Sequence, residues 1–469
     1  MRRRFFIALL TFCLMLPLFS SSPQTINAQE KDGNNQTKPS GKAKKLVAQG
    51  DQFFNKKDYR SAITKYAEAI VLSPKYSVAH YWKGYAHYYL NEFNETIEEL
   101  NTAFDLGYKP LEIYKLRWYV SYQKGDYETA LRDAEAGLKL DPQNKDFARV
   151  IGEIYFKNGS YPEAISALEK IIQTEPNNGD LQYFLAASYA KTGNIQQQAS
   201  TAKEAINKNT KFLADAYLLL GDALLLSNNN AEAIEAFKKA ISIKSDMPEE
   251  FFVTVSELFR SENRLNEAAD LAYKGLKLYP QNSELLINLT WYYSLSDRFV
   301  EAVSAGQQAI RNAPDNFAAH TNLCRAYNDL KQYPQAIFEC NKALKINPTD
   351  GETFFYLGFA HASTKKDALA TDYYKKAVAN LSKFARDNPK DADGHYLLGN
   401  AYYSDKQTKK AIESYKKSLE LSPNFAKAHL NLGFMHIVDQ NIPAAREQYN
   451  ILLKLNKGYA EKLSAAMEN

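Results

Sequence analysis

The sequence lacks the short motifs by which many enzyme families are identified. It contains no glycine-rich phosphate loop, no Gly-x-Ser-x-Gly, no His-Glu-x-x-His and no Cys-x-x-Cys. Acidic residues are plentiful, but the pattern places most of them on helix surfaces, where a solvated face is the ordinary interpretation. We therefore expect no catalytic residues, no cofactor and no enzymatic activity.

The sequence also lacks an excess of either charge. It has 58 Lys and Arg residues against 54 Asp and Glu residues, and three of the basic residues are Arg2, Arg3 and Arg4. Without these three the chain is nearly neutral, with 55 basic residues against 54 acidic ones. Proteins that bind nucleic acids generally carry a basic surface. The composition therefore predicts no nucleic-acid partner.

Long apolar runs are missing apart from one near the start of the chain. This run extends from Phe5 to Phe19, contains Pro17, and is followed by a polar stretch that ends at Ala28. It is shorter than the roughly 20 apolar residues of a membrane-spanning helix. The pattern favours a secretory signal peptide over residues 1–28. The alternative is an uncleaved N-terminal anchor, which would be the chain's only membrane contact. Both interpretations predict an exported protein, periplasmic or extracellular.

One residue pattern recurs along most of the remaining chain. Residues 29–42 have almost no apolar side chains and predict a flexible linker. After them a small residue, aromatic residues, alanines and a terminal proline repeat about every 34 residues. The first copy has them at Gly50, Phe53, Tyr59, Ala62, Tyr66, Ala69 and Pro74. The copies start at residues 43, 77, 111, 145, 179, 214, 249, 283, 317, 351, 392 and 426.

This pattern predicts pairs of short helices. Small residues let two helices approach closely, aromatic side chains fill the gaps beside them, and proline ends the second helix. The pattern resembles the tetratricopeptide repeat over residues 43–459. The resemblance implies an all-α fold, a right-handed superhelical solenoid of about twelve antiparallel helix pairs, with the end of a C-terminal helix over residues 460–469.

Two copies depart from the pattern. The fifth has Gln198 where alanine is expected, and the tenth carries about seven extra residues before Pro389. We expect a bend or altered stacking at these two places.

The histidines fall at repeat positions that this family fills with aromatic packing residues. They occupy the fourth position or the eleventh position, at His80, His320, His395 and His429 or at His87, His361 and His436. Metal ligands must converge in space and need supporting partners, whereas these residues are scattered along the chain. We therefore predict that they pack between helices and that there is no metal site.

Two cysteines, Cys324 and Cys340, lie on the facing helices of the ninth copy. They allow a disulfide that staples this hairpin in an oxidising compartment. They also allow two reduced, inert core residues. We favour the reduced state, because the geometry of a disulfide between two helices is demanding.

The resemblance also implies a binding surface. In relatives the first helix of each repeat lines a concave groove and offers its second, fifth, ninth, twelfth and thirteenth residues to a ligand. Here these positions form two aromatic groups separated by an acidic stretch. The predicted partner-binding residues are Tyr81, Tyr85, Tyr88, Tyr119, Tyr122, Asp222, Glu257, Trp291, Phe355, Phe359, Tyr396 and Tyr403. Exposed aromatic residues are enriched at binding hot spots, and the acidic stretch favours a partner with Lys or Arg. The alternative is that the aromatic residues pack against neighbouring repeats.

We therefore expect a scaffold that binds a protein or an extended peptide and helps to assemble an envelope or secretion complex. Some tetratricopeptide proteins grip a terminal carboxylate with Lys and Asn, but here the ninth positions include Tyr85, Tyr119 and Glu153, and Asn400 is the one asparagine among them. A clamp of that kind is not expected. The alternative function is a module that binds glycans or cell wall, since aromatic surfaces also stack on sugar rings.

Overall fold

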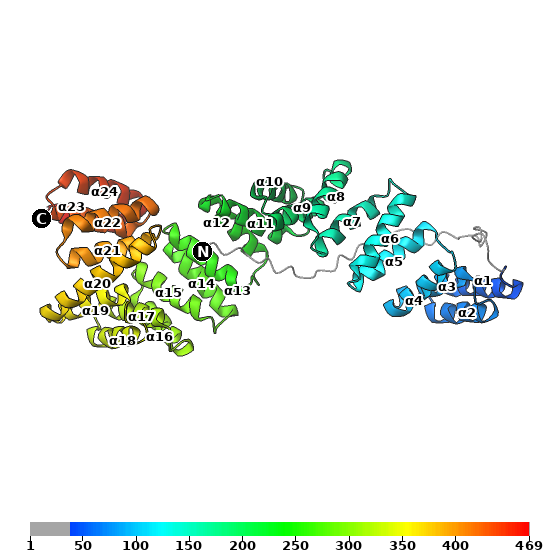
Figure 1. Ribbon diagram of the computed structural model, residues 1–469, viewed down its shortest axis with the longest axis horizontal. Coiled ribbons are helices and arrows are strands. Elements are labelled where there is room, and N and C mark those ends of the chain that lie inside the picture. The colour runs from blue at the N-terminus through cyan, green and yellow to red at the C-terminus, as the bar shows by residue number, and fades with distance from the viewer. Residues whose placement is uncertain (1–37, 469) are drawn as a thin grey trace. The chain divides into compact units, whose positions relative to one another are not determined.

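The computed structural model describes residues 38–468. These residues contain 25 α-helices and no β-strand (Figure 1). The predicted signal peptide and most of the predicted linker lie outside the described residues. Within the described part of the chain, none of the helices has both the length and the apolar character needed to cross a membrane.

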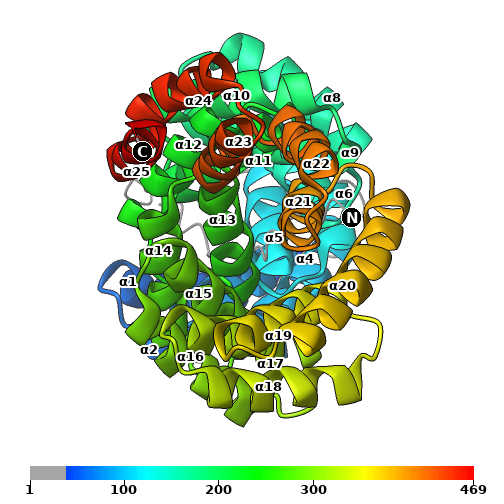
Figure 2. The ribbon, with the colours of Figure 1, turned by 90° about the vertical axis from the view of Figure 1, so that its left-hand side faces the viewer.

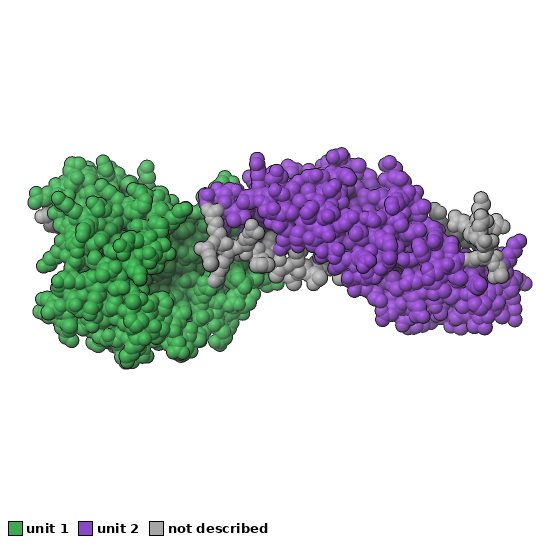
Figure 3. All heavy atoms as spheres, in the orientation of Figure 1, with its two compact units in different colours: residues 1–6, 229–469 green, residues 7–228 purple. Residues whose placement is uncertain are grey.

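The described chain divides into two compact units, residues 38–228 and residues 229–468, which Figure 3 colours purple and green. We call them the N-terminal unit and the C-terminal unit. The N-terminal unit contains α1 (Gly41–Asn55), α2 (Tyr59–Leu72), α3 (Ser77–Tyr89), α4 (Phe93–Asp105), α5 (Leu111–Gln123), α6 (Tyr127–Leu140), α7 (Lys145–Lys157), α8 (Tyr161–Thr174), α9 (Gly179–Thr192), α10 (Ile195–Asn207) and α11 (Leu213–Leu226). The C-terminal unit contains α12 (Asn230–Ile243), α13 (Glu249–Ser261), α14 (Leu265–Leu278), α15 (Ser283–Leu295), α16 (Phe299–Asn312), α17 (Phe317–Asp329), α18 (Tyr333–Ile346), α19 (Gly351–Ser363), α20 (Asp367–Asp387), α21 (Ala392–Ser404), α22 (Thr408–Leu421), α23 (Ala426–Val438), α24 (Ile442–Leu455) and α25 (Lys457–Glu468).

The odd-numbered helices from α1 to α23 are the first helices of the predicted copies. Ten of them begin at the residue that the pattern indicates. The other two begin slightly earlier: α1 at Gly41, inside the predicted linker, and α11 at Leu213. The 34-residue pattern therefore locates almost every helix start, because its small and aromatic residues recur at similar distances from the start of each first helix.

A tight turn joins the two helices of each copy, and one of its residues has a left-handed backbone. In three turns this residue is a glycine, as at Gly125, where the absence of a Cβ makes a positive φ inexpensive. In the other turns it is Lys57, Asn91, Asn228, Asn263, Asp297, Lys331, Lys365, Lys406 or Gln440. The regular recurrence of this conformation makes the hairpins alike.

The two helices of a copy approach closely at the small residue of the pattern. A Cβ atom on Gly50 would lie 2.5 Å from the ring of Tyr66, and one on Gly399 would lie 2.6 Å from the ring of Tyr415. Each tyrosine hydroxyl then donates a hydrogen bond to the residue after the glycine, Asp51 Oδ1 at 2.8 Å or Asn400 Oδ1 at 2.6 Å. The predicted contact of small residues with aromatic rings is confirmed at these sites.

Both irregular copies are accommodated within the helical array. The extra residues of the tenth copy lengthen α20 to 21 residues, whereas the other second helices have 13 or 14. Gln198 is buried in the N-terminal unit, and its Nε2 donates a hydrogen bond to the carbonyl oxygen of Leu219 at 2.8 Å. The polar residue thus links α10 to the next helix instead of providing a small contact surface.

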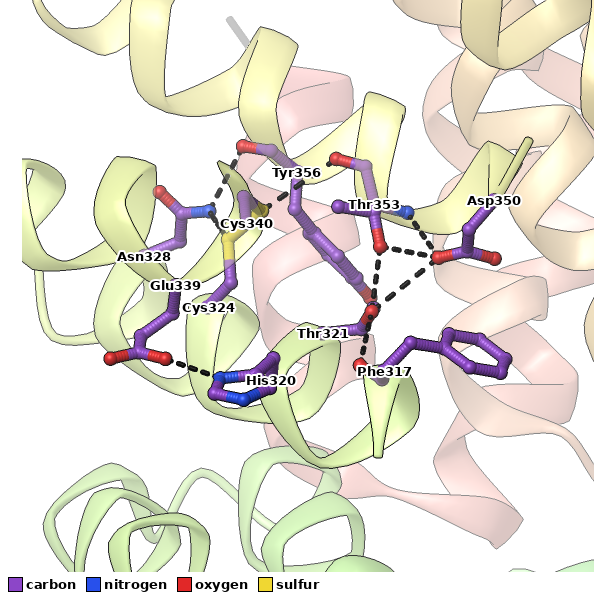
Figure 4. The surroundings of a disulfide bond; sticks show 10 residues. All are labelled: Phe317, His320, Thr321, Cys324, Asn328, Glu339, Cys340, Asp350, Thr353 and Tyr356. Carbon is purple, nitrogen blue, oxygen red and sulfur yellow. Dashed lines mark hydrogen bonds and ion pairs between the residues drawn. A yellow bond between two sulfur atoms is a disulfide. The ribbon is translucent and has the colours of Figure 1, made fainter. Parts of the chain in front are cut away.

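Cys324 and Cys340 form a disulfide that joins α17 to α18 (Figure 4). The prediction that we favoured, two reduced cysteines, is wrong, and the alternative is correct. The close approach of the two helices brings the Cα atoms to 5.3 Å, which falls in the usual range for a disulfide. Asn328 Nδ2 lies 3.8 Å from Cys324 Sγ and donates a hydrogen bond to the carbonyl oxygen of Tyr356. The disulfide therefore lies beside α19, the first helix of the next repeat.

Three histidines at the fourth repeat position make the same pair of contacts. In His80, Nδ1 lies 2.6 Å from Glu99 Oε2 and Nε2 lies 3.1 Å from the carbonyl oxygen of Pro74. The equivalent partners are Glu339 and Pro314 for His320, and Gln448 and Pro423 for His429. Each histidine therefore ties the end of one repeat to both helices of the next. Over the described residues, no three His, Cys, Asp or Glu side chains are grouped to hold a metal ion.

Candidate partner-binding groove of the C-terminal unit

The predicted aromatic residues of the second copy lie inside the packing of the N-terminal unit. Tyr81 is 5% exposed and Tyr85 is 8% exposed. The ring of Tyr85 stacks on Phe54 of α1, with 5.5 Å between the centroids, and lies 5.9 Å from that of Tyr81. The expectation that these two rings are exposed in a groove is therefore wrong, because α1 and α3 bring their aromatic residues together.

The other predicted aromatic residues of this unit are half-buried. They are Tyr88, Tyr119 and Tyr122. The rings of Tyr88 and Tyr119 meet edge to face at 5.8 Å, and Tyr122 meets Tyr127 at 5.5 Å. These contacts hold the rings in place on the unit's surface, and a role in partner binding stays a prediction for them.

Asp222, on α11, is a weak candidate for an anionic contact. Burial raises the pKa of its carboxyl group to about 8. The carboxyl group is therefore mostly protonated at neutral pH. Asp222 does not supply the negative charge that the predicted acidic stretch requires.

Two adjoining cavities open along the first helices of the C-terminal unit. The larger has a volume of about 800 Å³ and the smaller about 250 Å³. Leu295, Asp393, Phe425 and Lys427 line both cavities, so the two form one continuous hollow. We call it the C-terminal groove.

Five of the predicted binding residues line this groove. Glu257 lines the larger cavity, and Trp291, Phe355, Phe359 and Tyr396 line the smaller one. Phe359 is 41% exposed, whereas the other three aromatic residues are half-buried. Tyr403 is exposed but is not among the residues that line either cavity.

The aromatic wall of the groove is held by ring contacts within and between repeats. The ring of Tyr396 on α21 lies 4.7 Å from that of Phe425, which precedes α23. The ring of Phe355 on α19 contacts Tyr356 at 5.3 Å. Rings fixed in this way present apolar surface with little loss of side-chain entropy on binding.

Two arginines with little solvent exposure accompany these rings, and the predicted site omitted them. The Arg260 guanidinium lies 4.3 Å from the ring centroid of Trp291 and 2.6 Å from Glu257 Oε1. Arg325 is buried, with its guanidinium 5.6 Å from the same ring and Nη1 3.6 Å from Glu352 Oε1. Both arginines occupy groove positions of their repeats, the twelfth and the ninth. Examining those positions for basic residues would have found them.

Burial perturbs the charged groups of the groove. Burial raises the pKa of Glu352 to about 7, although Arg325 acts in the opposite direction. Burial also raises the pKa values of Asp329 and Asp393 and lowers that of Lys427. These charged groups are thus partly shielded from water, and polar groups of a partner would interact with them more strongly than on an open surface.

Two asparagines complete the wall of the smaller cavity. Asn431 Nδ2 on α23 donates hydrogen bonds to Asn400 Oδ1 at 2.9 Å and to the Tyr396 hydroxyl at 3.3 Å. Asn400 Oδ1 also accepts from Tyr415. This network fixes the orientation of the Asn400 amide in the groove.

Sequence comparisons agree with this repeat architecture. A model described as "TPR repeat" matches residues 50–91 and 399–436, and models described as "Tetratricopeptide repeat" match residues 121–187, 155–211, 214–247 and 295–355. Together they match more than half of the chain. The chain belongs to the tetratricopeptide repeat proteins. It is a repeat scaffold of the kind that binds protein or peptide partners.

The relatives of this repeat protein match it over short regions. Serine/threonine-protein phosphatase 5 of Homo sapiens is 29% identical over 105 residues, which are 22% of this chain and 21% of the phosphatase. Small glutamine-rich tetratricopeptide repeat-containing protein 2 of Saccharomyces cerevisiae is 28% identical over 119 residues, 25% of this chain and 33% of that protein. The match therefore spans a third or less of either relative.

Solved structures of repeat proteins are also similar. Yeast Tom70 is 17% identical with a TM-score of 0.38, and the match covers 90% of this chain and 94% of Tom70. A tetratricopeptide repeat protein from Parabacteroides merdae is 15% identical with a TM-score of 0.37, covering 55% of this chain and 99% of that one. At such TM-scores neither structure informs the function of this chain.

Proposed function

We propose that this chain is an exported, non-catalytic scaffold that binds an extended peptide or a segment of a partner protein in the C-terminal groove. Its role would be to help assemble an envelope or secretion complex. The single observation that carries the proposal is the continuous groove with an aromatic wall, on which Phe359 stands exposed. Anchoring aromatic residues beside a hollow are typical of binding hot spots.

The range of helices that line the groove favours a partner segment that contacts several repeats. The lining residues come from the six first helices α13 to α23, from α25, and from the ends of α12, α14, α22 and α24. An extended polypeptide segment in the hollow can therefore contact several repeats at once.

Two features support export. Residues 1–28 have the arginines, the apolar run and the polar end of a signal peptide. The chain also has a disulfide between Cys324 and Cys340, and disulfides persist mainly in oxidising compartments. Determining the N-terminal residue of the native protein tests this part: we expect Gln29, and a protein that retains Met1 in a cytosolic fraction would contradict it.

The glycan alternative depends on exposed aromatic surfaces. The burial of Tyr81 and Tyr85 removes the centre of one predicted surface. The rings of the C-terminal groove remain, so a glycan is kept as one outcome of the binding experiment.

Affinity capture from a native envelope extract tests the groove. The full chain is compared with Phe359→Ala and with Phe338→Ala, which removes an exposed ring from the second helix α18 and leaves the groove intact. Truncating a hot-spot ring costs about 2 kcal/mol or more, roughly 30-fold in affinity. We expect the partner protein to be lost with Phe359→Ala and kept with Phe338→Ala. Equal recovery with both variants would contradict the groove assignment, and recovery of glycan alone would support the alternative.

A further inference from the structure

The C-terminal groove is crossed by direct bonds between helices four repeats apart. Arg260 on α13 donates hydrogen bonds to Asp393 on α21, with Nη2 to Oδ2 at 2.9 Å and Nη1 to Oδ1 at 3.2 Å. Lys427 on α23 donates to the carbonyl oxygen of Ser294 on α15 at 3.2 Å, and its Nζ lies 3.8 Å from Asp297 Oδ1. Figure 2 shows α13 to α25 following the curved path that brings these helices together.

The two bridges join equivalent positions of their repeats. Both join residues that are 133 apart in the sequence, the twelfth position of one repeat and the second position of the fourth repeat after it. In the repeat family these positions face the groove and are offered to a ligand. In this unit they are bonded to each other instead, so the groove closes on itself through its own contact positions.

We propose that these two bridges form a latch that holds the C-terminal groove closed, and that a partner segment enters when the latch opens. The entry of a partner rests on the function proposed above, whereas the latch is a property of this unit alone. The latch consists of Arg260 with Asp393 and of Lys427 with Ser294 and Asp297.

The two bridges lie along the line where α13 and α15 meet α21 and α23, which we call the seam. The surroundings of the bridges favour opening of this seam. The larger cavity, about 800 Å³, lies between the two sides and is lined by Ser261 and Asn263 on one side and by Lys390 and Asp391 on the other. Surfaces that enclose a hollow of this size lose the dispersion contacts of tight packing. Polar interfaces within one chain generally permit relative motion unless they are large and apolar.

The partly buried charges make the bridge between Arg260 and Asp393 depend on both partners. The Arg260 side chain is 11% exposed and that of Asp393 is 22% exposed. Removing Asp393 leaves Arg260 with Glu257 alone, and removing Arg260 leaves the Asp393 carboxylate partly shielded from water without this cation. Opening the seam returns that charge to water. Breaking either bridge should therefore shift the equilibrium toward the open groove.

A distance measurement across the seam tests the latch without any partner. The full chain carries Cys13→Ser and is kept without reductant. Nitroxide labels are attached at Ser261→Cys and Lys390→Cys. Double electron–electron resonance then reports the separation of the two sides. We expect one narrow distance distribution. Arg260→Gln, Asp393→Asn and Lys427→Met should each add a population at longer distances.

Arg298→Gln is the matched control, because Arg298 lies next to Asp297 in the sequence but pairs with Glu301 of the same repeat, so its loss breaks a local ion pair and neither bridge. It should leave the distribution narrow. Circular dichroism identifies any variant that fails to fold, and the three substitutions act at two separate bridges. If all folded latch variants keep the narrow distribution of the unsubstituted chain, the latch does not exist.

The association rate of the captured partner tests the link to binding. If opening precedes entry, the apparent rate rises with the open fraction. Arg260→Gln should then associate about tenfold faster than the Arg298→Gln control. If Arg260→Gln lengthens the label distance but leaves the association rate unchanged, the latch exists but does not control the entry of the partner. Loss of the partner with Phe359→Ala would still identify the groove as the binding site.

Discussion

The two units use the same repeat for packing and different residues along their first helices. Gly50, Tyr66 and Asp51 in the N-terminal unit make the same contacts as Gly399, Tyr415 and Asn400 in the C-terminal unit. The difference lies at the groove positions. The second copy fills them with rings that bury one another, whereas the C-terminal unit places both rings and charged residues there, around a hollow.

This comparison teaches that an aromatic residue at a groove position is not by itself a binding residue. Tyr81 and Tyr85 stack on each other and on neighbouring rings, so their apolar surface is already buried. Phe359 occupies the ninth position of its repeat, as Tyr85 does, but stands exposed beside a cavity. The surrounding rings decide whether such a position stabilises the fold or contacts a partner.

The largest effect should come from the buried ring. Tyr85→Ala removes the contacts with Phe54 and Tyr81 and should lower the free energy of unfolding by about 3–5 kcal/mol. Phe359→Ala should lower it by only about 1 kcal/mol, because its side chain is 41% exposed. Urea unfolding followed by circular dichroism compares the two. Equal losses would mean that Phe359 is also a packing residue.

Removing the disulfide should cause the next largest loss in the free energy of unfolding. Cys324→Ala with Cys340→Ala removes a bond across a separation of 16 residues, and a loop of this length is worth about 3 kcal/mol. The loss should appear in the unfolding of the C-terminal unit. Adding reductant to the unsubstituted chain under unfolding conditions should reproduce it, and an unfolding midpoint insensitive to both treatments would contradict a structural disulfide.

The glycine contacts should give smaller and equal effects in the two units. Gly50→Ala and Gly399→Ala each place a Cβ atom within 2.6 Å of a tyrosine ring, so the rings must move. Overpacking of this kind costs about 1–3 kcal/mol. Thermal unfolding of the two variants checks whether the packing is the same. A large loss at one site alone would show that the units are packed differently.

The last effect depends on pH and comes from Asp222. The folded-state pKa is about 8 against an ordinary value of 3.8, so the folded chain holds a proton that the unfolded chain releases between these values. Wild-type stability should therefore fall as pH rises through this window, and Asp222→Asn should be progressively more stable than the wild type toward pH 8. The half-buried side chain reaches some water, which limits the size of the effect. Melting temperatures from pH 5 to pH 9 test the sign, and a gap that closes with rising pH would contradict it.

Much of the fold follows from the sequence because its determinants are local. The residues at the helix contact, such as Gly399 with Tyr415, recur in several copies, and the repeat pattern locates the starts of the first helices within two residues. The disulfide was misjudged because it depends on how closely α17 and α18 approach.

The site was only partly predictable for a different reason. Phe359 and Trp291 follow from the repeat positions, and both line the groove. The bridge from Arg260 to Asp393 does not, since it joins residues 133 apart. Whether they meet depends on the curvature that accumulates over four repeats, including the long α20. No local sequence pattern specifies this total curvature.

A pair of crosslinking positions tests the central claim most directly. A photoreactive amino acid replaces Phe359 in the groove or Phe338 on α18, both exposed rings of the C-terminal unit, and the full chain is irradiated in its native host. The account predicts that position 359 crosslinks to a defined segment of one partner protein and that position 338 does not. Crosslinks to the same partner from position 338 alone would contradict it and would move the binding surface to the second helices.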